Sequence, residues 1–273
     1  MFNYEDLKNL VREVLKEHRS SLNEGGNVFK SSEDGSATTI RIKQGDVDPT
    51  LRWLGTVLGI EKLEDFKLGT TGKKETSGDL DIAIDEKAVT KEELTNKLKA
   101  WVDQNHPGDN LRQWVAKTGI SVHFKTPIRG DEANGFVQTD LMFGNPDFML
   151  WAVKGEMGPS EYRGGDRQNL INAIATQRGY AWSAFFGLKD RETGERTNDP
   201  KEVVEKVLGL SEEELILGPD GNPKEFDSIY TLFDIIADKE KYPDDVYEKI
   251  REKAGFEFPH RDKEDKSLDE AKK

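Results

Sequence analysis

The chain has 273 residues, a net charge of −13, and 34% each of hydrophobic and charged residues. This length fits one large domain or two small ones. It contains no cysteine, which excludes disulfides and thiolate-bound zinc. The acidic balance argues against broad, sequence-independent coating of DNA, which depends on Lys and Arg neutralising phosphates.

The excess of acid is concentrated near the end of the sequence. Residues 201–273 hold 13 Lys and Arg against 21 Asp and Glu, a net charge of −8. A basic surface elsewhere is therefore compatible with the composition. No run approaches the roughly 18 apolar residues that a membrane span needs, and residues 3–22 read as a charged amphipathic helix rather than a signal peptide. We expect a cytoplasmic protein without a membrane partner.

The first half of the chain predicts an α/β domain. Residues 23–47 are rich in Gly, Ser and Asp, with a short strand at Thr38–Ile42. Asp48 and Pro49 are typical of the cap and first turn of a helix, which runs to Leu58. The elements expected next are strand Phe66–Leu68, strand Asp79–Ile84, helix Lys91–Gln104, and strands Ile120–Lys125 and Phe136–Phe143. This order predicts a mixed sheet flanked by helices.

The second half predicts a mainly helical region. Its expected helices are Asp147–Val153, Arg167–Arg178, Pro200–Leu208 and Ile229–Ala237. Tyr180–Leu188 is apolar enough for a strand, and Asp190–Gly194 reads as a turn. The predicted divisions are an N-terminal segment 1–47, a catalytic domain 48–145, a helical region 146–254 and a charged, flexible tail 255–273.

Two aspartates, Asp79 and Asp81, stand one residue apart on a predicted strand. Alternation puts both carboxylates on one face, where they repel each other unless a cation lies between them. Mg²⁺ or Mn²⁺, which prefer oxygen ligands, would meet that need. The alternative is a solvated edge strand, but the flanking Leu80 and Ile82 are apolar. We therefore predict that Asp79 and Asp81 are metal ligands.

The loop before this strand has the composition of a phosphate-binding loop. Glycines let backbone N–H groups turn toward a ligand, and lysines supply charge. The loop is not a Walker A motif, and without the nearby aspartates it would be an ordinary turn. The predicted nucleotide-binding residues in it are Gly69, Thr70, Thr71, Lys73, Lys74, Ser77 and Gly78.

A third carboxylate, Asp140, lies in an apolar predicted strand. An unpaired, ionised Asp is costly to bury there, and pairing with a metal offsets that cost. The alternatives are an exposed position on an edge strand, or a third ligand supplied by Asp147 or Glu132. Two-metal phosphoryl transfer uses a phosphate-binding loop together with such a carboxylate set. We predict Asp79, Asp81 and Asp140 as catalytic residues and as ligands of two ions.

Residues 161–169 read as a turn that leads into a helix. Two glycines permit close backbone approach to a sugar. Tyr162, Gly165 and Asn169 are therefore candidates for contact with a nucleoside. The alternative is a plain loop with a helix cap at Asp166.

The histidines carry no metal-site signal. They are His18, His106, His123 and His260, and they show no ligand spacing. His123 alternates with Val122 and Phe124 on a predicted strand, which favours a structural role.

Together these residues resemble the DNA polymerase β-like nucleotidyltransferase superfamily. Its pattern is a Gly-Ser-like loop, an Asp-hydrophobic-Asp strand and a third Asp on a later strand, here Gly69-Thr70, Asp79-Leu80-Asp81 and Asp140. The string KKETSGDLDIAI is similar to the family-X polymerase version, and the turn at 161–169 is similar to the turn that positions sugar and base. The chain also resembles nucleotidyltransferase-like proteins encoded by tailed phages.

The resemblance implies a mixed-sheet nucleotidyltransferase domain, followed by a thumb-like, mainly helical region with a small β-hairpin. It implies an enzyme with two Mg²⁺ or Mn²⁺ ions that transfers a nucleoside monophosphate from an NTP to an acceptor hydroxyl and releases pyrophosphate. A nucleic-acid 3′ end is the favoured acceptor. For a phage protein, the compartment would be the host cytoplasm.

Two alternatives stay open. The acidic balance, and the lack of helix-hairpin-helix Gly motifs, suit a protein or small-molecule acceptor. In the second alternative, the chain is a structural protein of a phage particle, which retains the fold but has no catalytic activity.

Overall fold

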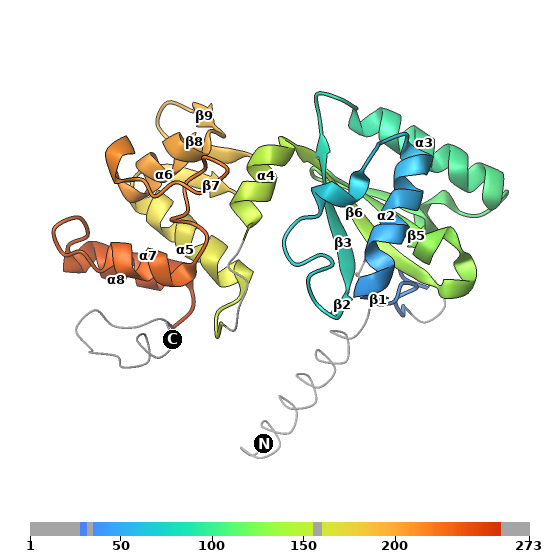
Figure 1. The fold of residues 1–273 in the computed structure, drawn as a ribbon, viewed down its shortest axis with the longest axis horizontal. Helices are drawn as coiled ribbons and strands as arrows, with labels where there is room; N and C mark the ends of the chain where they lie inside the picture. The colour runs from blue at the N-terminus through green and yellow to red at the C-terminus, as the bar shows by residue number, and fades with distance from the viewer. Residues whose placement is uncertain (1–27, 32–34, 155–159, 258–273) are drawn as a thin grey trace, which may run out of the picture. The chain divides into compact units, whose positions relative to one another are not determined.

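The computed structural model describes residues 28–31, 35–154 and 160–257 (Figure 1). The chain divides into two compact units, Met1–Pro146 and Asp147–Lys273. The fold is mixed α/β, as the sequence predicts. The predicted helix at 3–22 and nearly all of the tail 255–273 lie outside the described residues. Within the described residues, no helix combines the length and apolar character needed to cross a bilayer.

The first unit is built on a four-stranded sheet with the order β3-β6-β5-β4. Its strands are β3 (Asp79–Asp85), β4 (Val115–Thr118), β5 (Ser121–Pro127) and β6 (Phe136–Gly144). β3 and β6 are parallel, whereas the other two pairs are antiparallel. A parallel pair needs a long crossover, which contains α3 (Lys91–Asn105) and the β4–β5 hairpin. The three predicted strands of this sheet are confirmed, and β4 is an addition that the sequence did not predict.

One face of the sheet packs against α2 (Gln44–Leu58) and α3 (Figure 1). Leu80 and Ile82 of β3 are fully buried in this core. The helix residues buried with them include Leu51, Leu54 and Leu58 of α2 and Leu94 and Leu98 of α3. Because side chains alternate along a strand, Asp79 and Asp81 point to the opposite face. A one-residue slip would bring these carboxylates into the core, so the apolar packing fixes the register.

Helix α2 begins earlier than the sequence predicts. Pro49 lies inside the helix, and Asp48 forms an ion pair with Lys67 instead of capping. The reason is tertiary anchoring of Gln44, whose backbone N–H donates to Glu75 O at 2.9 Å. Its side chain also donates to Gly72 O at 3.0 Å. The start of α2 is therefore tied to the loop that precedes β3.

Two short predicted strands are replaced by other structure. Phe66–Leu68 is the end of a 3₁₀ turn, Leu63–Phe66, followed by a single bridge between Lys67 and Ile82. The expected strand Thr38–Ile42 overlaps with β1 (Ile42–Lys43) only at Ile42. β1 pairs with β2 (Thr76–Ser77), which leads directly into β3.

Among its described residues, the second unit packs five α-helices around one apolar core. They are α4 (Pro146–Val153), which begins at the boundary, α5 (Gly164–Gln177), α6 (Pro200–Leu208), α7 (Ile229–Ile236) and α8 (Asp244–Ala254). A small antiparallel sheet is formed by β7 (Tyr180–Ser183), β8 (Gly187–Asp190) and β9 (Arg196–Thr197). The mainly helical region with a small hairpin is thus as predicted.

Three details of this unit differ from the sequence prediction. The single strand expected at Tyr180–Leu188 is a hairpin, since Gly187 has a φ of 81° that starts the return strand. Helix α5 is capped at Arg163, and Asp166 accepts the Arg163 backbone N–H at 2.7 Å. Helix α8 was not predicted, because its charge-dense sequence buries only Tyr247, Ile250 and Ala254.

Candidate active site

The three predicted carboxylates lie on one face of the sheet, on adjacent strands. In the parallel pairing of β3 with β6, Asp81 is the register partner of Asp140 and Asp79 that of Gln138. Directly paired residues in a sheet point to the same side. The face that carries Asp79 and Asp81 is therefore the face that carries Asp140, opposite the helices.

Burial and mutual repulsion act on the two carboxylates of β3. Burial, followed by the charges of Asp79 and Asp140, raises the pKa of Asp81 to about 7. Burial and the charge of Asp140 also raise the pKa of Asp79, partly opposed by Arg41. Within the described residues, no side chain donates a hydrogen bond to either carboxylate. Positive charge placed here would relieve both effects.

Asp140 has a different environment, because it is held by neighbouring side chains. Its Oδ1 is 2.7 Å from Nδ1 of His123 on β5. Gln138 Nε2 donates to Oδ1 at 2.9 Å and to Oδ2 at 3.1 Å. In the part of the chain that the structure describes, no three His, Asp or Glu side chains form a ready group around a metal position. The three carboxylates share a face, but Asp140 is engaged on the β5 side.

The donor set nevertheless suits Mg²⁺ or Mn²⁺. Both ions favour carboxylate oxygens, and three such groups are available on this face. Asp79 and Asp81 have no side-chain donor among the described residues, and burial together with repulsion between the carboxylates raises the pKa of both groups. Asp140 Oδ2 retains a lone pair beyond the one that accepts from Gln138. The residues present therefore fit divalent cations.

The loop before β3 is folded tightly onto that strand. Gly69 and Gly72 have φ values of 57° and 70°, in the left-handed region that favours glycine. The Asp81 backbone N–H donates to Thr71 Oγ1 at 3.1 Å, and the Gly72 N–H donates to Ser77 Oγ at 3.2 Å. Thr71 and Ser77 are buried, so their hydroxyls fix the loop beside the carboxylates.

Other groups of the same loop are available to a ligand. Within the described residues, the backbone N–H groups of Gly69, Thr70 and Lys74 have no acceptor. The side chains of Thr70, Lys73 and Lys74 are exposed, and neither lysine has a carboxylate partner among these residues. Gly78 is half-buried and leads directly into β3. The loop thus offers free N–H donors and two unpaired ammonium groups next to the carboxylate face.

Arg41 is a site residue that the sequence did not indicate. Its Nε donates to Thr76 Oγ1 at 3.1 Å and its Nη2 to Thr76 O at 3.2 Å. The guanidinium is close enough to Asp79 to lower the pKa of that carboxyl against the effect of burial. No local signal could reveal this role, because the β1–β2 pairing brings together residues 35 positions apart.

The rival third carboxylates have other surroundings. Glu132 Oε1 lies 2.7 Å from His106 Nε2, in the connection between β5 and β6. Asp147 belongs to the second unit. Neither residue belongs to β3 or β6, the strands that carry the three aspartates.

The residues predicted to contact a nucleoside belong to the second unit. The ring centroid of Tyr162 lies within 6 Å of the centroids of three aromatic rings, those of Tyr230, Phe233 and Phe256. Gly165 and Asn169 are exposed in the first turns of α5. Open space surrounds the position of a Cβ on Gly165. Tyr162 is thus a packing residue of this unit, whereas the other two are open to solvent.

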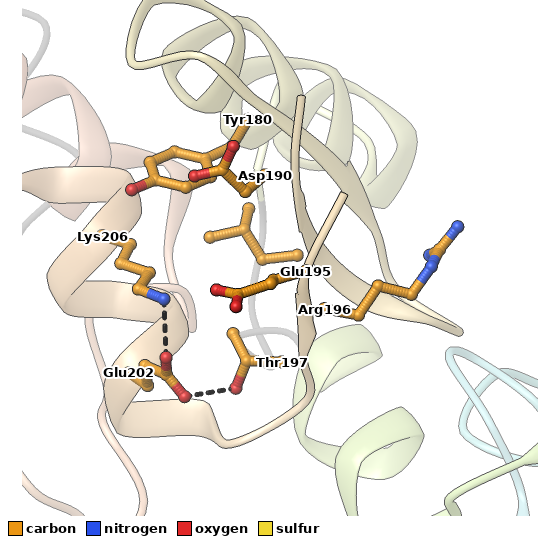
Figure 2. A pocket seen from close by; sticks show the side chains of 8 residues that line it. Tyr180, Asp190, Glu195, Arg196, Thr197, Glu202 and Lys206 are labelled. Carbon is orange, nitrogen blue, oxygen red and sulfur yellow. Dashed lines mark hydrogen bonds and ion pairs between the residues drawn. The ribbon is translucent and has the colours of Figure 1, made fainter. Parts of the chain in front are cut away.

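The second unit also contains a polar pocket of about 320 Å³ between the β7–β9 sheet and α6 (Figure 2). Glu202 accepts from Lys206 at 2.6 Å and from Thr197 at 2.5 Å. Asp190 and Glu195 add carboxylates to the lining, whereas the Arg196 side chain is directed away (Figure 2). None of the predicted site residues lines this pocket.

Comparisons with known proteins give a distant structural likeness. No protein-family model matches the chain, and no curated protein matches it. Among solved structures, the chain is similar to polymerase beta of Leishmania infantum, determined as a ternary P/T complex. The two share 10% sequence identity with a TM-score of 0.36, over 84% of this chain and 78% of that one.

Proposed function

We propose that the chain is a metal-dependent nucleotidyltransferase, which transfers a nucleoside monophosphate from an NTP to an acceptor hydroxyl and releases pyrophosphate. The observation that supports this most directly is the register of β3 and β6, which sets Asp79, Asp81 and Asp140 on one face. The motif resemblance and the loop before β3 support the same activity. A carboxylate face beside a phosphate-binding loop is the arrangement that phosphoryl transfer requires.

In this proposal the residues have distinct roles. Asp79, Asp81 and Asp140 hold two Mg²⁺ or Mn²⁺ ions, which when bound supply charge neutralisation on the attacking and leaving oxygens. The N–H groups of Gly69 and Thr70, the Thr70 hydroxyl and the Lys73 ammonium bind the triphosphate. Thr71 and Ser77 keep the loop against β3, as their hydrogen bonds already do.

The reaction itself is an in-line displacement at the α-phosphorus. The acceptor hydroxyl oxygen forms the new bond to phosphorus, and the bond to the pyrophosphate oxygen breaks. Asp140 takes the proton that the hydroxyl loses. Arg41 and Lys74 add positive charge beside the departing pyrophosphate, where negative charge accumulates.

The acceptor in this proposal is a nucleic-acid 3′ end, and a protein or small-molecule hydroxyl is the alternative that the assay must separate. We would incubate the full chain with each of labelled ATP, CTP, GTP and UTP, with Mg²⁺ or Mn²⁺, and with RNA, DNA and protein acceptors. Label transferred to one acceptor class, with release of pyrophosphate, is the expected result.

Asp85 supplies a matched control for this assay. It lies on β3 with Asp79 and Asp81 but is exposed at the end of the strand, where it accepts the Lys87 N–H at 2.9 Å. Asp81→Asn should abolish transfer, and Asp85→Asn should leave it intact. If the wild-type chain binds no nucleotide at any Mg²⁺ or Mn²⁺ concentration, a non-catalytic structural protein replaces the enzyme proposal.

A further inference from the structure

A chain of three side chains runs across the sheet from Asp140 to the edge strand β4. Asp140 on β6 is the antiparallel register partner of His123 on β5. The His123 Nδ1 lies 2.7 Å from Asp140 Oδ1, and its Nε2 is hydrogen-bonded to the Thr118 hydroxyl. The His123 side chain is only 9% exposed. Its ring is therefore fixed at both nitrogens by partners on two neighbouring strands.

The partners decide which nitrogen of His123 carries the proton. An ionised carboxylate can only accept, so Nδ1 donates its proton to Asp140. In the neutral ring Nε2 is then an acceptor, and the Thr118 hydroxyl donates to it. This arrangement sets both the tautomer and the rotation of the ring.

The two oxygens of Asp140 are held unequally. Oδ1 accepts from His123 at 2.7 Å and from Gln138 at 2.9 Å, whereas Oδ2 accepts only from Gln138, at 3.1 Å. Gln138 is itself fixed, because its Oε1 accepts the Val28 backbone N–H at 3.0 Å. Oδ1 is thus occupied, and Oδ2 is the oxygen with more free acceptor capacity.

We propose that His123 is a positioning residue for the third carboxylate: it holds Asp140 Oδ1 so that Oδ2 is presented as the metal-binding oxygen. This inference rests on the proposed function. Groups that hydrogen-bond a metal ligand orient it, and their loss typically costs about 10- to 100-fold in metal affinity. His123 does this from the neighbouring strand, and Thr118 supports it in turn.

Amide substitutions separate the two nitrogens of His123. His123→Asn places an amide near the position of Nδ1 and retains a donor to Asp140. His123→Gln places its amide near the position of Nε2 and retains only the contact with Thr118. His123→Leu removes the contacts with both Asp140 and Thr118. Thr118→Val removes the hydroxyl that contacts His123 Nε2 and leaves the donor to Asp140 in place.

The test is a titration of the full chain with Mn²⁺, in which the electron paramagnetic resonance signal of free Mn²⁺ reports binding. The unfolding midpoint of each variant is a second readout. We expect His123→Leu and His123→Gln to bind Mn²⁺ roughly 10- to 100-fold more weakly than wild type. We expect the Mn²⁺ affinity of His123→Asn to stay close to that of wild type. The affinity of Thr118→Val should lie between that of wild type and that of His123→Leu. Comparing the Asn and Gln variants keeps the test decisive if the Leu variant does not fold.

The possible failures are distinguishable. Equal Mn²⁺ affinity of the Asn and Gln variants, or unchanged affinity in the Leu variant, would overturn the role of His123 and leave the proposed function standing. A wild-type chain that binds no Mn²⁺ would overturn the proposed function, and this inference with it.

Discussion

Asp81 and Asp140 are direct partners in the parallel pairing of β3 and β6, so two carboxylates from distant parts of the sequence lie side by side on the face of the sheet opposite α2 and α3. Burial, together with the charges of Asp79 and Asp140, disfavours the ionised form of Asp81 and raises its pKa to about 7. The folded protein therefore prefers a proton, or a cation, at this position.

The first prediction concerns the pH dependence of stability. The folded pKa of Asp81 lies above its ordinary value of 3.8, so the folded state binds the extra proton between these values. The contribution of this carboxyl to the free energy of unfolding is fully present below about pH 4. It is lost as pH rises through about 7. Asp81→Asn should abolish this loss and raise the free energy of unfolding at pH 8 by roughly 2–4 kcal/mol.

Urea unfolding of wild type and Asp81→Asn at pH 4 and pH 8, without divalent cations, measures this difference. Asp85→Asn is the control, since that side chain is exposed on the same strand. A gain at pH 4 as large as that at pH 8 would contradict the assignment of the repulsion to an ionised Asp81.

The second prediction concerns divalent cations. Protons compete with metal for a carboxylate whose pKa is about 7, so Mn²⁺ should stabilise the wild-type chain more at pH 8 than at pH 5.5. Saturating a site a hundredfold above its Kd adds about 2.7 kcal/mol to the free energy of unfolding. Thermal unfolding with and without Mn²⁺ measures the shift. Asp81→Asn should lose most of the stabilisation by Mn²⁺. A stabilisation that does not depend on pH would indicate that Mn²⁺ binds at a site without Asp81.

The third prediction concerns the loop before β3. Lys73 is exposed and has no carboxylate partner among the described residues, so it is free to bind phosphate. A charge-assisted hydrogen bond contributes on the order of 1.5–3 kcal/mol. Lys73→Ala should therefore weaken NTP affinity by roughly 10- to 100-fold at fixed Mg²⁺.

Calorimetry with the four NTPs tests the role of Lys73. Lys87→Ala is the matched control, because Lys87 is an exposed lysine just beyond β3. A nucleoside without phosphates should bind weakly and show no response to Lys73→Ala. An equal loss of affinity in both lysine variants would point to general electrostatics rather than to this loop.

The sequence predicts best where local periodicity carries the information. Asp79 and Asp81 follow the two-residue period of a strand, with apolar Leu80 and Ile82 between and after them, so their common face could be inferred. Helix α3 was also predictable, because Leu94, Leu98 and Val102, which it buries, recur at helical spacing. In each case the residues that decide the structure lie within a few positions of one another.

The parts that the sequence did not predict depend on long-range pairing. His123 contacts Asp140 only because β5 and β6 adopt one particular antiparallel register. Arg41 reaches Thr76 because β1 pairs with β2, and α2 begins at Gln44 because that residue bonds to Glu75. Alternation of His123 with apolar neighbours indicated a strand but gave no information about its partner.

The fourth prediction tests the hairpin of the second unit. Gly187 has a φ of 81°, and a Cβ there would lie 2.0 Å from the backbone oxygen of Thr197. Gly187→Ala combines backbone strain with a clash that only movement of β9 can relieve, and should destabilise the chain by roughly 2 kcal/mol or more. Gly194→Ala is the control, because its φ is 79° and nothing lies within 4 Å. If urea unfolding showed equal losses of stability for Gly187→Ala and Gly194→Ala, backbone strain alone would account for the loss and the clash with Thr197 would contribute nothing.

The last prediction concerns Arg167, which is 5% exposed in the core of the second unit. Its Nη1 donates to the carbonyls of Phe226 at 2.7 Å and Asp227 at 3.1 Å, and also to that of Lys154. Burial lowers the pKa of the guanidinium, partly opposed by the charge of Asp227. This one side chain therefore ties the end of α4 to the segment before α7.

Arg167→Leu should destabilise the chain by about 3–5 kcal/mol, because it leaves buried carbonyls without a donor. Arg167→Lys should recover only part of the loss, since one ammonium cannot reproduce the planar array of donors. Arg196→Leu is the control, because Arg196 is exposed on β9, and its effect should stay within about 0.5 kcal/mol. Urea unfolding followed by circular dichroism measures all three. If Arg167→Leu were as stable as Arg196→Leu, the carbonyls would have to be satisfied by other donors, and the linking role of Arg167 would be lost.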